Sequence, residues 1–162
     1  MQRTIIASLL ILFLAACEPV DRRPGMWLSG EVITEEINDW TFSNSFMEVN
    51  LETHPWYGVP FSVTVVAATT GQKLFVPSIY SKPAEFPGGK YWNGIIEKNP
   101  AVRIRIGAKL YPRSAHLITD ANEFEEAFAA LAAKYDFWRA VKDGPIEERP
   151  PFVLIRLDPP KQ

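Results

Sequence analysis

The chain contains one cysteine and two histidines in 162 residues. A single cysteine cannot form an internal disulfide or a cysteine-based zinc site, and two histidines leave little for a histidine metal site. A basic excess is also missing, because 17 lysines and arginines face 19 aspartates and glutamates. No Gly-x-Ser-x-Gly, P-loop or HExxH pattern occurs, so hydrolase, nucleotide-phosphate and zinc-protease functions have no support. We therefore expect neither a bound metal nor a nucleic-acid partner.

The composition that is present describes one globular domain. Hydrophobic residues make up 47% and charged residues 22% of the chain, which excludes a disordered protein. Fourteen prolines argue against an all-helical architecture, because proline breaks a helix interior. The length leaves room for one domain of ordinary size.

An apolar run near the N-terminus extends from Ile5 to Leu14, after Arg3. It is too short to cross a bilayer as a helix and has the form of a signal peptide. Two alanines then precede Cys17, which resembles the lipobox of bacterial lipoproteins. The resemblance implies a lipoprotein signal peptide over residues 1–16 and a lipidated Cys17 as the mature N-terminus. A plain signal peptide with an incidental cysteine, or a buried N-terminal strand, are the alternatives.

The stretch over residues 17–25 lacks apolar periodicity and contains two prolines and a glycine, which is typical of a tether. Acyl chains such as palmitate on Cys17 would hold the protein on a membrane of the bacterial cell envelope, since each buried methylene contributes about 0.8 kcal/mol. In enterobacterial lipoproteins an aspartate after the cysteine favours the inner membrane. Glu18 stands there instead, so we expect a lipid-anchored protein that faces the periplasm, with the outer membrane favoured.

The middle and end of the chain alternate in the manner of β-strands. Val102, Ile104 and Ile106 are separated by Arg103 and Arg105, so apolar and charged side chains should lie on opposite faces. The run over 61–68 carries little charge and is predicted to be a central strand. Prolines in two runs indicate an edge, a bulge or an interruption. Strands are predicted over 29–37, 46–53, 61–68, 73–79, 101–107, 109–119 (interrupted at Pro112) and 152–157, with a hairpin turn at 69–72.

Two helices are predicted between these strands. The first, Tyr91–Lys98, ends before Asn99-Pro100, which is a helix-stop signal. The second spans Ala121–Tyr135, with Asp120 as its cap and Glu123 as the capping-box partner. Its apolar residues form one stripe that should pack in the core: Phe124, Ala127, Phe128, Leu131 and Tyr135. The pattern predicts a small antiparallel barrel of the α+β class, mainly β, over residues 26–158, followed by a tail at 159–162.

Three stretches in a fixed order resemble a known group of proteins. Residues 74–78, Leu-Phe-Val-Pro-Ser, form a strand that ends in serine; residues 90–100 form a short helix that closes on Asn-Pro; and residues 102–107 form the next strand. Their order, from about Thr53 to Thr119, is similar to the split β-barrel of pyridoxamine 5'-phosphate oxidase-like and deazaflavin-dependent nitroreductase-like proteins. The resemblance implies a split β-barrel that forms a homodimer.

The same resemblance implies a cofactor at the subunit interface: FMN first, a deazaflavin or haem less favoured. A flavin needs cations or amides for its phosphate and an aromatic wall for its ring. Trp56 is an alternative to Trp92 for stacking on that ring. The residues expected at the cofactor are Ser78, Lys90, Trp92, Arg103 and Arg105. The alternatives without a ligand are that Arg103 and Arg105 are solvated on an outer strand face and that Trp92 plugs the end of the barrel. For His54 and His116, structural roles are favoured over ligation of haem iron.

Two departures from the family pattern concern positive charge. FMN-binding members usually carry a basic residue on the strand that corresponds to residues 61–68, and deazaflavin-binding members usually carry a basic stretch near residues 53–60; this chain has no lysine or arginine in either. Two functions follow. One is a lipid-anchored oxidoreductase that uses a flavin-type cofactor on a small molecule. The other is a cofactor-free envelope protein on the same fold, with a role in binding or assembly.

Overall fold

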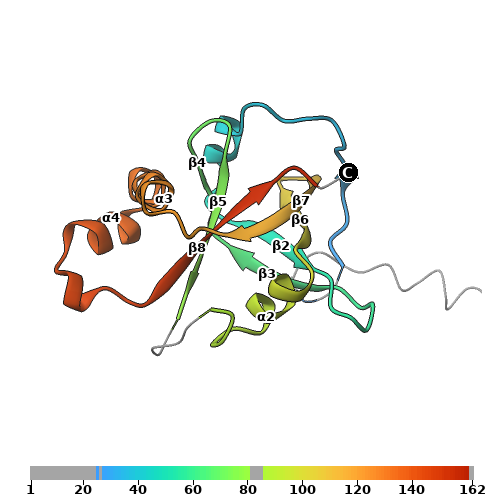
Figure 1. Cartoon of the computed structure of the whole chain (residues 1–162). Helices are drawn as coiled ribbons and strands as arrows, with labels where there is room; N and C mark the ends of the chain where they lie inside the picture. Colours follow the sequence, from blue (N-terminus) through green and yellow to red (C-terminus); the bar gives the residue numbers. More distant parts are fainter. Residues whose placement is uncertain (1–24, 26, 81–85, 161–162) are drawn as a thin grey trace, which may run out of the picture.

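The computed structural model describes residues 25, 27–80 and 86–160. A β-sheet forms the centre of this part of the chain, α3 and α4 lie together on one side of it, and α2 lies below it in the view of Figure 1. The strands are β1 Glu31–Val32, β2 Val49–Thr53, β3 Phe61–Val65, β4 Ala68–Thr69, β5 Leu74–Ile79, β6 Ala101–Ile106, β7 Lys109–Leu117 and β8 Phe152–Asp158. The helices are α2 Tyr91–Lys98, α3 Ala121–Lys134 and α4 Asp136–Asp143, with 3-10 turns at Thr41–Ser45 and Ile146–Glu148.

The strands follow the order β3-β2-β6-β7-β8-β5-β4, and all neighbours on this path are antiparallel. This open, mainly antiparallel sheet with three helices in the described part of the chain confirms the predicted small α+β split barrel. The run predicted to be one central strand over 61–68 is divided into β3 and β4, and these two strands lie at opposite ends of the order. A single β-rich run thus supplies both ends of the open sheet.

The first strand is much shorter than the predicted run over 29–37. β1 contains only Glu31 and Val32 and pairs in parallel with Lys109 and Leu110 of β7. After β1 the chain leaves the sheet, with Ile33 and Ile37 packed against the core and the residues between them exposed. The buried residues of this segment are therefore four positions apart, and not two apart as in a strand.

The two strand prolines lie where a neighbouring strand has ended. Pro77 of β5 faces Leu154 of β8, while the pairing of β4 with β5 reaches no further than Phe75. Pro112 faces Arg103 of β6, between the residues of β7 that pair with β1 and those that pair with β8. Because no ladder hydrogen bond is lost there, β7 continues through Pro112, and the predicted interruption is wrong.

Two hydrophobic clusters share β5 and β8. One fills the barrel and includes Leu51, Val76 and Ile104, all without exposed surface. The other packs between the sheet and α3–α4, around Phe75, Phe128, Trp138 and Leu154, with exposed fractions of 1% or less. Successive side chains of a strand point to opposite faces, so β5 is buried on both sides from Leu74 to Ser78.

The predicted apolar stripe of α3 is confirmed, because its residues belong to the second cluster. Asp120 caps the helix, and its Oδ1 accepts a hydrogen bond from the Glu123 N–H at 2.8 Å. The carboxylate of Glu123 instead contacts Lys73 and Arg156, so it does not act as the predicted capping-box partner. Helix α4 was not predicted: it is short, and its buried contact with the core comes from a single residue, Trp138.

The proposed signal peptide at 1–16 and the lipidated Cys17 lie outside the described residues. Within residues 25, 27–80 and 86–160, no helix has the length and apolar character needed to cross a membrane.

Candidate functional site

A cavity of about 460 Å³ lies between α2 and the loop that joins β2 to β3. We call it the Trp56–Tyr91 cavity. Its two aromatic residues are unusually open, with 95% of Trp56 and 57% of Tyr91 exposed. The lining residues are His54, Pro55, Trp56, Tyr91, Gly94, Ile95, Lys98 and Asn99. Aromatic groups therefore stand beside two basic side chains in one hollow.

The helix-stop residue fixes the shape of this cavity. Asn99 caps the C-terminus of α2, and its Nδ2 donates to the carbonyl oxygen of His54 at 3.1 Å. A turn follows in the loop, where the Gly58 N–H donates to the Pro55 oxygen at 3.1 Å. Gly58 has φ +81°, in the left-handed region that favours glycine. The Asn-Pro signal thus ends the helix and also attaches it to the aromatic loop.

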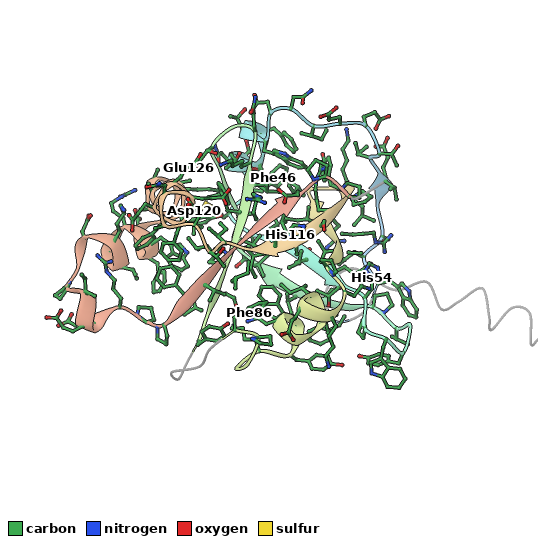
Figure 2. The ribbon with its side chains drawn as sticks, viewed as in Figure 1. Phe46, His54, Phe86, His116, Asp120 and Glu126 are labelled. Atoms are coloured by element: carbon green, nitrogen blue, oxygen red, sulfur yellow. The ribbon has the colours of Figure 1, made fainter. Side chains whose placement is uncertain are left out.

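His54 is held from both ring nitrogens and lies beyond the end of β2 (Figure 2). Its Nδ1 lies 3.1 Å from the carbonyl oxygen of Ala101, and its Nε2 lies 3.0 Å from Oε1 of Glu52. Both partners are acceptors, so the doubly protonated imidazolium satisfies both contacts. The hydrogen bond to Glu52 is the main cause that raises the pKa of His54, although burial opposes it. His54 is therefore a basic residue in the cavity wall, fixed in place through both ring nitrogens.

Glu52 connects His54 to Arg103. Its side chain has no exposed surface, and Arg103 donates from Nε to Oε1 at 2.7 Å and from Nη2 to Oε2 at 2.9 Å. The Leu28 N–H donates to Oε2 at 2.6 Å. Burial acts to raise the pKa of Glu52, but the hydrogen bonds from His54, Leu28 and Arg103 outweigh it and lower that pKa. The result is a buried carboxylate between two cations.

The aromatic wall of the cavity is internally braced. The hydroxyl groups of Tyr57 and Tyr91 lie 3.0 Å apart. Trp56 meets Tyr57 edge-to-face with ring centroids 5.8 Å apart, and Tyr91 meets Phe61 in the same way at 5.2 Å. Such edge-to-face contacts fix the orientation of rings while leaving other faces open to a ligand.

Two of the sequence-predicted site residues are buried inside the chain. Ser78 is 1% exposed and exchanges hydrogen bonds with the side chain of Asn93 at 3.1 Å. Asn93 also donates to the hydroxyl of Tyr80 at 2.9 Å. Trp92 is 5% exposed and belongs to the barrel cluster, while Trp56, the other candidate for stacking, lines the cavity. The cofactor-binding roles of Ser78 and Trp92 remain predictions.

The three predicted cations occupy different settings. Arg103 is bound to Glu52, and Arg105 donates from Nη2 to Oδ1 of Asn50 at 2.7 Å. Both stand on the face opposite the buried Val102, Ile104 and Ile106, as predicted. Lys90 is exposed at the N-cap of α2, next to the cavity residue Tyr91. Their roles toward a cofactor also remain predictions.

Sequence reasoning missed Tyr91 and Lys98 as cavity residues. They lie seven positions apart on α2, so the helix repeat places them on one face, two turns apart, together with Gly94 and Ile95. This periodicity was available in the sequence, but nothing in it showed that the loop with Trp56 would fold against that face. The two histidines are separate and hydrogen-bonded, His116 through Ser114 at 2.9 Å. Figure 2 labels both of them.

Comparisons with known proteins give matches to solved structures alone. No family model matches the chain, and no curated protein matches it. A Listeria innocua protein named after pyridoxamine 5'-phosphate oxidase is 17% identical, with a TM-score of 0.52 over 74% of this chain and 88% of its own. The F420-H2-dependent reductase FDR-A is 17% identical, with a TM-score of 0.50 over 70% and 95%.

The haem storage protein HutZ from Vibrio cholerae is 16% identical, with a TM-score of 0.53 over 75% of this chain and 87% of its own. A further matching structure is described as a domain-swapped dimer. At these identities the likeness concerns the fold. The chain therefore shares the split β-barrel fold of pyridoxamine 5'-phosphate oxidase-like and F420-dependent reductase proteins.

Proposed function

We propose that this protein is a lipid-anchored oxidoreductase of the bacterial envelope that binds a flavin-type cofactor, FMN or a deazaflavin, in the Trp56–Tyr91 cavity. The observation that carries the proposal is the cavity itself, in which exposed aromatic rings stand beside the basic side chains of His54 and Lys98. Proteins with this fold include a reductase that depends on F420-H2 and a haem storage protein. A redox cofactor in this cavity is consistent with the ligands named for these two proteins of the same fold.

The size and wall of the cavity fit a planar ring. Small-molecule sites have volumes of about 300–1,000 Å³ and are mostly apolar; this cavity has about 460 Å³. Trp56 and Tyr91 offer rings for stacking, and Ile95 adds an apolar surface. The residues present therefore fit the ring of a flavin.

The charges of the cavity fit a phosphate. Lys98 is exposed at the last turn of α2, and His54 carries its raised pKa on the adjoining wall. The negative charge of Glu52 is buried and already compensated by Arg103 and the Leu28 N–H. Lys98 is therefore the side chain of this cavity that can donate a charge-assisted hydrogen bond to a phosphate, because both ring nitrogens of His54 are already bonded within the chain.

In this function the protein binds and orients, and the flavin supplies the hydride chemistry. Trp56 and Tyr91 would hold the ring and exclude water from its stacked face, while Lys98 would bind the phosphate. The cofactor-free envelope protein is the second candidate, because Ser78 and Arg103 are engaged within the chain.

A titration of FMN against the full chain in detergent tests the cofactor. We expect Lys98→Ala to weaken FMN binding by about 1.5–3 kcal/mol, roughly tenfold to a hundredfold, because this is the range of hydrogen bonds to charged groups. Lys90→Ala tests whether the lysine predicted from the sequence contributes to FMN binding. Lys109→Ala, which removes an exposed lysine on β7, is the matched control. FMN fluorescence reports binding, and the free energy of unfolding of each variant should stay within about 0.5 kcal/mol of wild type. No saturable binding at high micromolar FMN would remove the flavin and leave the cofactor-free protein.

We also expect a homodimer that covers the open face of Trp56. Trp56 is 95% exposed, and tryptophan is enriched among the interface residues whose truncation costs about 2 kcal/mol or more. Light scattering on the detergent-solubilised chain should give the mass of a dimer at micromolar concentration, and Trp56→Ser should shift it toward the monomer. A strictly monomeric wild type would contradict an interface cofactor site.

A further inference from the structure

A second cavity of about 460 Å³ lies where the segment after β1 meets β7 and the residues that follow β8. It shares no lining residue with the Trp56–Tyr91 cavity. Four apolar residues form its walls: Ile33, Pro112, Pro159 and Pro160. Its polar residues are Arg113, Thr34, Glu35 and Glu36. We call it the Arg113 cavity.

Arg113 is an unusual arginine because it is only 6% exposed and lacks an ion pair with any described residue. It lies on the core-facing side of β7 with Tyr111 and Ala115, and its guanidinium rests 4.5 Å from the ring centroid of Trp40. Its Nε is buried and has no hydrogen-bond partner. Burial lowers the pKa of Arg113, and the carboxylates of Asp158 and Glu36 offset this in part without an ion pair to the guanidinium.

A buried cation without a hydrogen-bonding anion is costly, and a ligand that brings the anion lowers that cost. A planar guanidinium matches a carboxylate with two parallel hydrogen bonds. The cation–π contact with Trp40 holds the guanidinium over the indole ring before any ligand arrives. The arginine is therefore preorganised toward a carboxylate.

The cavity walls define the rest of the ligand. Prolines lack an N–H group, so three of the four apolar wall residues offer no backbone donor, and they suit an aromatic or aliphatic body. Glu35 and Glu36 are exposed at the same cavity and repel a second negative charge. These charges oppose a phosphate dianion about twice as strongly as a single carboxylate, so the monoanion is the favoured ligand.

We propose that the Arg113 cavity is a binding site for a small organic monocarboxylate with an apolar body, held through its carboxylate by Arg113. This site is independent of the flavin-type cofactor, because its residues belong to different elements.

Phenylacetate is the probe, titrated against the full chain in detergent by calorimetry. Wild type should bind it saturably, and its uncharged analogue 2-phenylethanol and the dianion phenyl phosphate should bind at least tenfold more weakly. Arg113→Met keeps an unbranched apolar stem on Trp40 and should weaken phenylacetate binding by roughly tenfold to a hundredfold, the range for a hydrogen bond to a charged group. Its melting temperature without ligand should equal or exceed that of wild type, because a desolvated charge is removed.

Glu36→Gln keeps the arginine and removes a repelling charge, so it should strengthen phenylacetate binding several-fold. Glu147→Gln, an exposed acid on the turn Ile146–Glu148 outside the cavity, is the matched control and should change nothing. Absence of saturable phenylacetate binding by wild type, or equal affinities of wild type and Arg113→Met, would overturn the proposal. If Arg113→Met fails to fold, the comparison of phenylacetate with 2-phenylethanol and the response to Glu36→Gln decide the matter.

Discussion

Replacing Glu52 by glutamine should destabilise the fold by about 3 kcal/mol, the lower end of the range for breaking a buried ion pair. The carboxylate has no exposed surface and accepts hydrogen bonds from Arg103, His54 and the Leu28 N–H. Glutamine keeps the size but loses the charge, so Arg103 and His54 lose their counter-ion. We place the effect at the lower end because Arg103 retains 27% exposure and contact with water.

A matched variant separates the effect of losing a buried ion pair from the effect of losing an exposed one. Glu126 contacts Lys73 at 3.0 Å, but both side chains are more than 40% exposed. Glu126→Gln should therefore change the free energy of unfolding by less than about 1 kcal/mol, as exposed pairs do. Urea denaturation of both variants measures the difference. Equal effects of Glu52→Gln and Glu126→Gln would contradict the assigned role of the buried carboxylate.

The pH dependence of stability gives the same network a second signature. The pKa of Glu52 is lowered on folding, so its contribution is present above its unfolded pKa of about 4.3 and is lost as the pH falls through the folded value. The pKa of His54 is raised, so its contribution is full below about 6.5 and is lost as the pH rises through the folded value. The network is therefore strongest between these values. In Glu52→Gln both slopes should flatten.

The sequence was sufficient to predict those elements in which the buried residues recur at one regular spacing. The alternation around Arg103 and Arg105 predicted β6 and its two faces, and the stripe of α3 predicted the packing of that helix. It was insufficient where tertiary contacts replace a local pattern. β1 keeps two residues because the chain leaves the sheet to anchor Ile33 and Ile37, and α4 is held largely by the burial of Trp138.

The candidate site shows the same limit more strongly. Glu52 alternates like an outward-facing strand residue, yet it is fully buried, because the backbone of Leu28 lies over it. No local pattern predicts that a segment 24 residues away will cover a strand face. Ser78 shows the reverse case: a hydroxyl expected to meet a cofactor is bonded to Asn93, which the helix α2 places beside it.

Replacing Cys17 by alanine should release nearly all of the protein from the membrane. The proposal makes lipid on this cysteine the anchor, and several acyl chains at about 0.8 kcal/mol per buried methylene hold far more strongly than exposed surface residues can. The substitution leaves three alanines at positions 15–17, which fits the small-residue pattern of an ordinary signal-peptide cleavage site. The expected product is a soluble chain that starts at Glu18. Membrane fractionation after a carbonate wash, with mass spectrometry of the N-terminus, measures both outcomes.

Two further measurements make this result specific to lipid. Growth with a labelled fatty acid should mark wild type and leave Cys17→Ala unmarked. Trp56→Ser, which removes the most exposed tryptophan but keeps the cysteine, should stay in the membrane fraction, since a single aromatic side chain adds far less than acyl chains. If Cys17→Ala is cleaved before Glu18 and still resists the carbonate wash, the anchor lies elsewhere, and the exposed aromatic residues of the Trp56–Tyr91 cavity would be the surface to test for it. If wild type carries no label, the cysteine has another role, and the plain signal peptide becomes the better explanation of the first 16 residues.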